Sequence, residues 1–120
     1  MKPCEVVTYH GKLIIIVDIS NTTPEEAIAY FPHAQKIIAQ FPPQSALILT
    51  DVINASYTKE SVAALKEFAA ANTPYVKASA TVGSEGLREI LLHTVERYTK
   101  RKIYACTTRD EALDWLTSQE

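Results

Sequence analysis

Hydrophobic and polar residues alternate along this chain in two periods, and the changes of period predict where strands and helices lie. Short apolar runs rich in isoleucine and valine, such as residues 13–17, are typical of buried strands. Other stretches repeat apolar residues every three or four positions, as at Leu87, Leu91 and Val95, which is typical of an amphipathic helix. The pattern predicts strands at residues 4–9, 12–18, 45–50, 75–82 and 103–107, with a helix after each strand from the second onward.

Capping residues predict where the helices begin. Thr23 is followed three residues later by Glu26, the spacing of a capping box, and Thr108 has the same pattern. A further helix is expected to begin near Thr58. Pro32 lies inside the first helical stretch, where we expect a kink or a break, because proline lacks a backbone N–H and crowds the preceding turn.

The predicted elements follow the order ββαβαβαβα. The first two strands are separated only by His10-Gly11, which indicates a hairpin. After the hairpin, strands and helices alternate strictly, and this favours a mixed, mostly parallel sheet joined by right-handed crossovers. A chain of 120 residues is the length of one domain. The prediction is a single α/β domain over residues 1–120.

The fourth strand differs from the others because its polar and apolar residues alternate. One face carries Val76, Ala78, Ala80 and Val82, and the other carries Tyr75, Lys77, Ser79 and Thr81. A strand covered on both faces has a continuous apolar sequence. We therefore expect the polar face of this strand to be thinly covered and to face solvent or a partner.

Charge and composition exclude several classes of protein. The chain has 12 Lys and Arg against 14 Asp and Glu, so no basic field favours nucleic-acid binding. The longest apolar run stops at Asp18, far short of the roughly 18 residues of a membrane span, and no signal peptide is expected at the start. Cys4 and Cys106 lack metal-ligand spacing. They are expected to be free thiols in a cytoplasmic protein, with a disulfide as the alternative if their strands are neighbours.

The strand ends supply the candidate binding residues, because open α/β sheets bind ligands beyond the carboxyl ends of their strands. These ends bring together Asp18, Asp51, Asn54, Gly83 and Ser84. The two aspartates could form a metal site or an acid–base pair, or could accept hydrogen bonds from loop amides. Two carboxylates do not by themselves fill the coordination shell of a hard cation, so no metal is predicted.

Residues 82–86, Val-Gly-Ser-Glu-Gly, could hold an anion at the start of a helix or form a tight turn. They match neither a dinucleotide-binding nor a Walker pattern, and Glu85 would repel a phosphate. The basic residues Arg97, Lys100, Arg101 and Lys102 are expected to compensate the dipole of the helix that they end. No cofactor is predicted. No spacing of a nucleophile and a base indicates catalysis, so an enzyme is not expected.

Several segments resemble the STAS fold, and within it the small bacterial SpoIIAA-like group. They are residues 47–51, Leu-Ile-Leu-Thr-Asp, residues 75–83, and residues 111–116, Glu-Ala-Leu-Asp-Trp-Leu. The likeness covers about residues 4–117 and implies a right-handed β/α superhelix. The group is also structurally similar to lipid-exchange domains of the CRAL-TRIO type.

The resemblance implies a regulatory role. In anti-sigma-factor antagonists of this family, a hydroxyl residue after the third strand is phosphorylated by a partner kinase. Asp51 matches the first Asp of the family pattern, and Ser56, Tyr57, Thr58 and Lys59 stand where the family has Asp-Ser-Ser-Gly. Thr58 or Ser56 is therefore the candidate phosphoacceptor. A phosphate there adds about −1.5 to −2 charges at a helix start.

Two function hypotheses remain open. The first is a non-enzymatic module that binds a protein partner, such as an anti-sigma-factor-like regulator. Its contact surface would be the loop after the third strand, the following helix at residues 58–71 and the turn after the fourth strand, with Tyr57 and Lys59 among the binding residues. The second is a binder of a small hydrophobic molecule or lipid, with an apolar pocket near Phe31, Tyr57 and Tyr75. A homodimer is also plausible, because the hairpin edge and the polar strand face each offer an unpaired surface.

Overall fold

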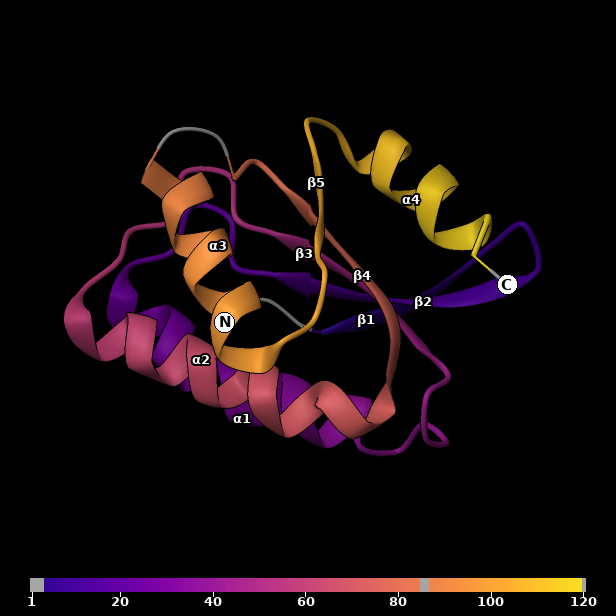
Figure 1. The fold of residues 1–120 in the computed structure, drawn as a ribbon, viewed down its shortest axis with the longest axis horizontal. Helices are drawn as coiled ribbons and strands as arrows, with labels where there is room; N and C mark the ends of the chain where they lie inside the picture. The colour runs from indigo at the N-terminus through magenta and orange to yellow at the C-terminus, as the bar shows by residue number, and fades with distance from the viewer. Residues whose placement is uncertain (1–3, 85–86, 120) are drawn as a thin grey trace.

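The predicted strands and helices form in the predicted order (Figure 1). The structure, a computed structural model, describes residues 4–84 and 87–119. Its strands are β1 (Glu5–Tyr9), β2 (Lys12–Asp18), β3 (Ala46–Asp51), β4 (Val76–Val82) and β5 (Tyr104–Cys106). Its helices are α1 (Pro24–Ile38), α2 (Lys59–Asn72), α3 (Leu87–Thr99) and α4 (Arg109–Thr117), with a 3₁₀ turn at Thr73–Tyr75 between α2 and β4.

The strands form one mixed sheet. In the described part of the chain it has five strands in the order β1-β2-β3-β4-β5. β1 and β2 pair antiparallel through a turn at His10 and Gly11, which both have positive φ, and the later pairs are parallel. The predicted α/β class and element order are confirmed.

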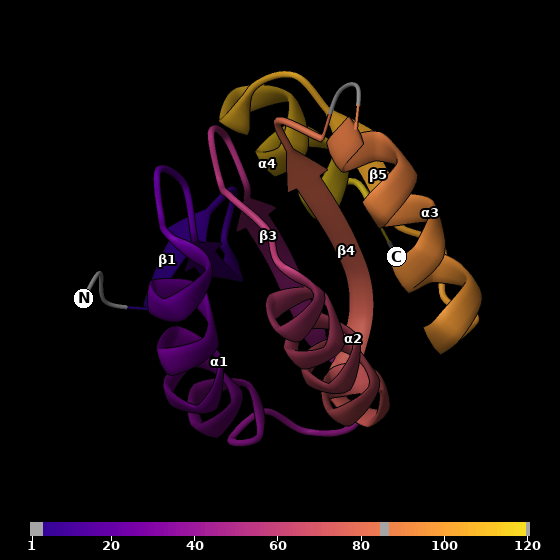
Figure 2. The same ribbon diagram turned by 90° about the vertical axis from the view of Figure 1, so that its left-hand side faces the viewer.

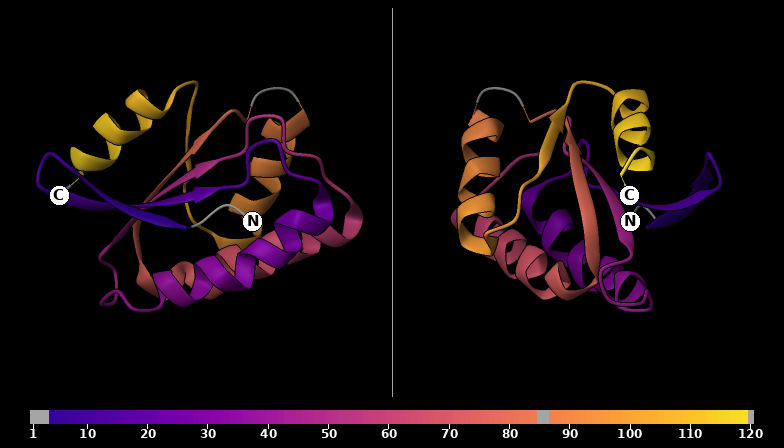
Figure 3. Two further views of the ribbon diagram at one scale, coloured as in Figure 1. Left: turned by 180° about the vertical axis from the view of Figure 1, so that it is seen from behind. Right: turned by 45° about the vertical axis from the view of Figure 1, so that its right-hand side comes forward.

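Helices cover the two faces of the sheet unequally. The order of the parallel strands never reverses, so crossovers of one hand place their helices on the same side. α1 and α2 lie side by side, with α3 next to α2 (Figure 2). α4 lies across the sheet from them (Figure 3, right). We call these sides the three-helix face and the α4 face.

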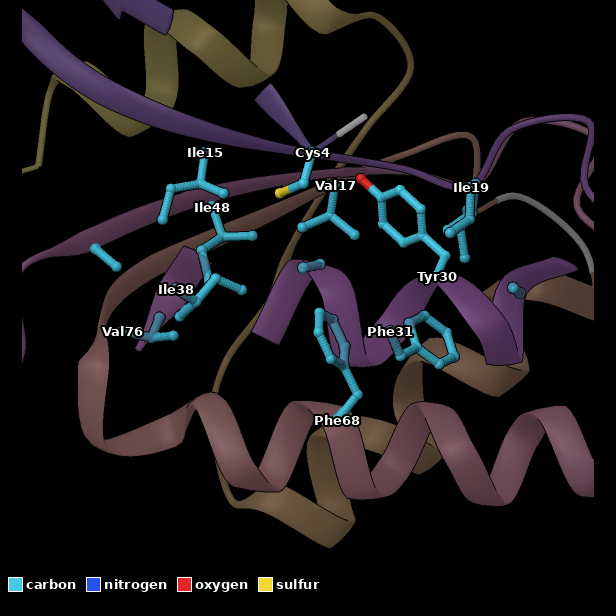
Figure 4. Packing of buried hydrophobic residues seen from close by; sticks show 14 of the residues in the cluster. Cys4, Ile15, Val17, Ile19, Tyr30, Phe31, Ile38, Ile48, Phe68 and Val76 are labelled. Carbon is cyan, nitrogen blue, oxygen red and sulfur yellow. The ribbon is translucent and has the colours of Figure 1, made fainter. Parts of the chain in front are cut away.

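Large apolar side chains fill the three-helix face between β2, β3, α1 and α2 (Figure 4). The rings of Phe31 and Phe68 stack with centroids 4.7 Å apart and planes 21° apart, which joins α1 to α2. Tyr30 is also buried, and its hydroxyl accepts the backbone N–H of Asp18 at 3.2 Å. Burying one such side chain stabilises the fold by about 1.5–3 kcal/mol.

A second core lies on the α4 face. Ile14, Leu49 and Leu116 are fully buried there, and Cys106 belongs to the same cluster. Cys4 belongs to the core of the three-helix face. The two thiols are free and lie on opposite faces of the sheet, so the disulfide alternative is wrong. Burial raises the pKa of both thiols, that of Cys106 to about 11.

The predicted alternation in β4 holds only from Ala78 onward. Val76 pairs with Ala46, but the next residue of β3, Leu47, pairs with Ala78. Lys77 is therefore an extra residue in the ladder, as in a β-bulge. Because one extra residue reverses the side on which a side chain points, Val76 joins the core of the three-helix face while Ala78 packs on the α4 face.

α1 continues through Pro32 without the expected break. Pro32 cannot donate a hydrogen bond to the carbonyl of Ile28, and proline inside a helix costs about 3 kcal/mol. Its neighbours Tyr30, Phe31 and Ala34 are all buried in the core. Their burial outweighs the cost of the proline and keeps the helix continuous.

Threonine caps begin three of the helices. Thr23 and Thr108 are N-caps, as predicted, and Thr58 is the N-cap of the helix that was expected to begin near it. At Thr108 the reciprocal half of the capping box differs, because the carboxylate of Glu111 accepts the backbone N–H of Thr107 at 3.1 Å rather than that of the cap. Among residues 4–84 and 87–119, no helix is both long enough and apolar enough to cross a bilayer.

Candidate functional site

The ends of β2, β3 and β4 lie next to one another, as predicted. Asp18 pairs with Asp51 in the register of β2 and β3, and Asp51 pairs with Val82 in the register of β3 and β4. Gly83 follows with φ +87°, and a Cβ there would lie 2.5 Å from Cγ1 of Ile53. Only glycine suits both the positive φ and this close approach. The strand-tip edge is therefore a tightly packed junction.

The two aspartates accept hydrogen bonds from their own loops. Oδ1 of Asp18 accepts the backbone N–H of Ser20 at 3.0 Å and its hydroxyl at 2.6 Å. Oδ1 of Asp51 accepts the backbone N–H of Ile53 at 3.1 Å. The interpretation that these side chains bind loop amides is confirmed.

Arg109, the first residue of α4, connects the two aspartates. Its Nε donates to Oδ2 of Asp51 at 2.9 Å, and its Nη2 lies 3.1 Å from Oδ2 of Asp18. Burial lowers the pKa of Arg109, but the hydrogen bond and charge of Asp51, with the charge of Asp18, outweigh it and raise the pKa. The three side chains form a clamp between the strand tips and α4. Within the described ranges, no group of three or more His, Cys, Asp or Glu side chains is placed to hold a metal ion.

Sequence reasoning did not single out Arg109, although one signal was present. A cation in the first turn of a helix faces the positive end of the helix dipole and is disfavoured there. Arg109 follows the Thr108 cap directly, so an acidic partner outside α4 could have been expected. The sequence did not show which carboxylates would be within reach.

The loop after β3 is joined to the loop after β2. Asn54 and Asn21 both have positive φ, and Nδ2 of Asn54 donates to Oδ1 of Asn21 at 3.2 Å. The backbone N–H of Ser56 donates to the carbonyl of Thr22 at 3.1 Å. The side chains of Asn54 and Ser56 are exposed on this loop.

The next three candidate residues divide between the surface and the interior. Thr58 and Lys59 are exposed at the start of α2, where the Thr58 hydroxyl accepts the backbone N–H of Ser61 at 3.2 Å. Tyr57 is half-buried and packs against the core of the three-helix face. The predicted binding residues therefore do not form one continuous exposed surface.

The other part of the strand-tip edge is the turn after β4. The backbone N–H of Gly83 donates to the carbonyl of Cys106 at 3.3 Å, joining the ends of β4 and β5. Ser84 is only 4% exposed. Glu85 and Gly86, which complete the possible anion site, lie outside the described residues, so that prediction stays open.

A pocket lies on the three-helix face between the sheet, α2 and α3. Its cavity volume is about 70 Å³. The apolar part of its wall includes Ile48, Val52, Leu65, Phe68, Leu92 and Val95. The pocket therefore lies beneath two helices, beside the strand-tip edge rather than outside it.

Buried polar side chains also line this pocket. Asn72, Thr81 and Ser84 are 3%, 7% and 4% exposed, and within the described part of the chain none has a side-chain hydrogen bond. Ser79 is buried beside them. The prediction that the polar face of β4 is thinly covered and faces solvent or a partner is wrong. α2 and α3 cover it, and its hydroxyls face an internal cavity.

Arg101 reaches the pocket from the segment after α3. Lys100 has φ +59° and turns the chain at the end of that helix. Nη2 of Arg101 then donates to the carbonyl of Ala69, near the C-terminal end of α2, at 3.0 Å. The prediction that Arg101 compensates the dipole of its own helix is therefore wrong, because its guanidinium lies at the end of a different helix.

Of the three aromatic residues expected near a pocket, Phe31, Tyr57 and Tyr75, one lines the observed pocket. Tyr57 lines the pocket between α2 and α3. Phe31 and Tyr75 instead pack in the core beside α1. The sequence could not separate core aromatics from a pocket aromatic, since both kinds of position are apolar and recur at helical or strand spacing.

The fold and the pocket define a class of protein: a single α/β domain with a mixed five-stranded sheet and a small, mostly apolar pocket under two of its helices. No protein-family model, no curated protein and no solved structure matches the chain.

Proposed function

We propose that this protein is a non-enzymatic binding module that holds a small molecule in the pocket between the sheet, α2 and α3. The observation that carries the proposal is the set of buried side chains Asn72, Thr81 and Ser84, which line the cavity without hydrogen bonds from the described residues. In the described part of the chain, no fully enclosed polar side-chain atom lacks a partner, so the amide and hydroxyl groups of these residues reach the space of the pocket. An occupant of the pocket would be within reach of these groups for hydrogen bonding.

The composition of the lining supports binding rather than catalysis. Mostly apolar walls with a few converging polar groups are typical of ligand sites. The polar lining residues carry amide, hydroxyl, phenol or guanidinium groups, and the described lining has no Asp, Glu, His, Cys or Lys. Such groups orient a ligand but do not exchange a proton near neutral pH. A cytoplasmic location accords with the two free thiols.

Native mass spectrometry of freshly purified protein tests this proposal. We expect a bound small molecule in the wild type and its loss in Ala69→Leu, which fills the pocket from α2. Ala71→Leu is the matched control, since Ala71 is exposed on the same helix. Ala69→Leu must first be shown to be folded, because overpacking costs about 1–3 kcal/mol. Bare wild-type protein after gentle extraction would contradict the proposal.

A second candidate function is regulation through a protein partner, as the resemblance to SpoIIAA-like proteins implies. The observation that favours it is the position of Thr58, an exposed residue at the N-cap of α2, with Ser56 and Lys59 exposed beside it. A phosphate at a helix N-terminus is stabilised by the helix dipole. Tyr57, between the two hydroxyl residues, lines the pocket and would connect the two functions.

This second candidate has its own test. Intact-mass and peptide analysis of protein from its native cells should find a phosphate on Thr58 or Ser56. Thr58→Asp should change the affinity for an identified partner. Thr58→Asn, which keeps an N-cap of similar strength without the charge, should not. Equal effects of the two variants would show that the loss of the threonine side chain matters rather than the charge.

Self-association remains a prediction for the hairpin edge alone. β1 forms an outer edge of the sheet, and Val6 and Leu13 are exposed on the hairpin. The other predicted surface, the polar face of β4, is covered by α2 and α3. Light scattering that gives the monomer mass at high concentration would exclude a dimer.

A further inference from the structure

Arg101 is held in the wall of the pocket by three uncharged acceptors. Its Nε donates to Oγ1 of Thr73 at 3.0 Å, its Nη1 to Oγ of Ser79 at 2.9 Å, and its Nη2 to the carbonyl of Ala69 at 3.0 Å. A guanidinium has five N–H donors in a fixed plane. Three bonds fix that plane and leave two N–H groups for another acceptor.

This guanidinium has no carboxylate partner among the described residues. The carboxylate of Glu96, which lines the neighbouring surface hollow with Arg101, accepts the backbone N–H of Ile103 at 2.7 Å instead. Arg109 is the opposite case, since its guanidinium pairs with both Asp18 and Asp51. Burial lowers the pKa of Arg101, because desolvation disfavours its charged form. Arginine nevertheless keeps its charge in proteins.

A partly buried cation without a counter-ion is costly, and an anion would remove much of that cost. The C-terminal end of α2 contributes only a partial negative charge. A carboxylate matches the planar fork of a guanidinium with two parallel hydrogen bonds. Asn72, Ser79 and Thr81 lie in the same wall and add further polar partners.

The size and walls of the pocket limit the rest of the ligand. The cavity of about 70 Å³ is about half the ~150 Å³ cavity that admits benzene, so it has room for a tail of about three carbon atoms, while the carboxylate lies at the half-buried Arg101 in the pocket wall. Ile48, Leu65 and Val95 offer apolar contacts to a short chain of carbon atoms. A phosphate would place two charges opposite one guanidinium and against these apolar walls.

We propose that the ligand of this pocket is a small carboxylic acid with a short apolar tail, whose carboxylate pairs with Arg101. This inference rests on the proposed binding function and names the ligand class of the same pocket. It assigns Arg101 as the residue that selects for negative charge.

Nuclear magnetic resonance titration of the wild-type protein tests the ligand class without a variant. The probes are butyrate, 1-butanol, butylamine, octanoate and inorganic phosphate. We expect butyrate to shift the amide signals of Thr81 and Ser84 and the side-chain amide of Asn72. It should bind at least about tenfold more tightly than each of the other four probes, because it alone combines one negative charge with a short tail.

Arg101→Gln should remove the preference for butyrate over 1-butanol. Arg97→Gln is the matched control, since Arg97 is exposed on α3 and outside the pocket, and it should keep the preference. Arg101 also joins α2 to β4, so its variant requires a check of folding. If Arg101→Gln does not fold, Thr81→Val, which removes one hydroxyl from the pocket wall, should weaken butyrate binding severalfold.

The outcomes separate the inference from the proposed function. Equal binding of butyrate and 1-butanol would overturn the inference and leave a neutral-ligand pocket. Tighter binding of phosphate than of butyrate would overturn the assignment of a carboxylate ligand. Tighter binding of octanoate would overturn the assignment of a short tail. If no probe shifts the pocket signals and the freshly purified protein is bare, the inference and the proposed function both fail.

Discussion

The three-helix face has two halves that use the same sheet in opposite ways. Beneath α1 and α2, aromatic and branched side chains such as Phe31 and Ile38 pack into one core cluster and are 4% and 0% exposed. Beneath α2 and α3, β4 presents Ser79 and Thr81, and a cavity remains. Because both halves have parallel strands covered by crossover helices, the difference comes from the side chains of β4. One half stabilises the fold, and the other leaves room for a ligand.

The substitution with the largest expected effect is Phe31→Ala, in the half beneath α1 and α2. Phe31 is 4% exposed and stacks on Phe68, so its removal should lower the free energy of unfolding by about 3–5 kcal/mol. Chemical denaturation measures this loss, and Phe31→Leu serves as a milder control. A loss below about 1 kcal/mol would show that this half can relax around a cavity, contrary to its assigned role.

Gly83→Ala tests the junction beside the pocket. The added Cβ would lie 2.5 Å from Ile53 Cγ1 and 3.0 Å from Ile53 Cα, at φ +87°. We expect a loss of about 2–4 kcal/mol from the clash and the strained backbone. Gly11→Ala is the matched control, with φ +76° and nothing within 4 Å of the new atom, and should lose only about 1 kcal/mol. Equal losses of stability at Gly83 and Gly11 would show that the positive φ alone, and not the clash with Ile53, causes the destabilisation.

Thr81→Val tests the half beneath α2 and α3, and it should raise the free energy of unfolding rather than lower it. Thr81 is 7% exposed, and its hydroxyl faces the cavity without a hydrogen bond from the described residues, so replacing it with a methyl group should stabilise the ligand-free protein by up to about 1 kcal/mol. Thermal unfolding without ligand measures the change. Thr8→Val, on the exposed face of β1, should change stability by less than about 0.5 kcal/mol. Clear destabilisation by Thr81→Val would mean that an unseen partner, such as a bound water, already satisfies the hydroxyl.

The clamp of Arg109 and Asp51 should contribute least. A double-mutant cycle of Arg109→Gln and Asp51→Asn should give a coupling of about 0.5–1 kcal/mol, because the side chain of Arg109 is 42% exposed and solvent screens the pair. The coupling should decrease as salt is added. A large coupling that salt does not change would show that the clamp, rather than either core, anchors α4.

Several features of the fold and site were predictable because they depend on neighbouring residues. The hairpin at His10 and Gly11 and the caps at Thr23 and Thr108 follow from turn and capping chemistry within a few positions. The pairing of Asp18 with Asp51 follows from parallel strands ending at one edge. The face of the sheet on which the Val76 side chain lies was not predictable, because the bulge at Lys77 depends on the pairing of β4 with β3.

The sequence by itself determined the types and order of the elements, the mixed sheet and the meeting of the strand tips, because local periodicity and one crossover hand are enough to specify them. Only the tertiary structure decided that α1 continues through Pro32, that Arg109 joins two aspartates, and that Arg101 enters a pocket. These outcomes depend on contacts between residues distant in the chain: Arg109 and Asp51 are 58 positions apart, and Arg101 and Ala69 are 32 apart. Periodicity carries no information about such distant pairs.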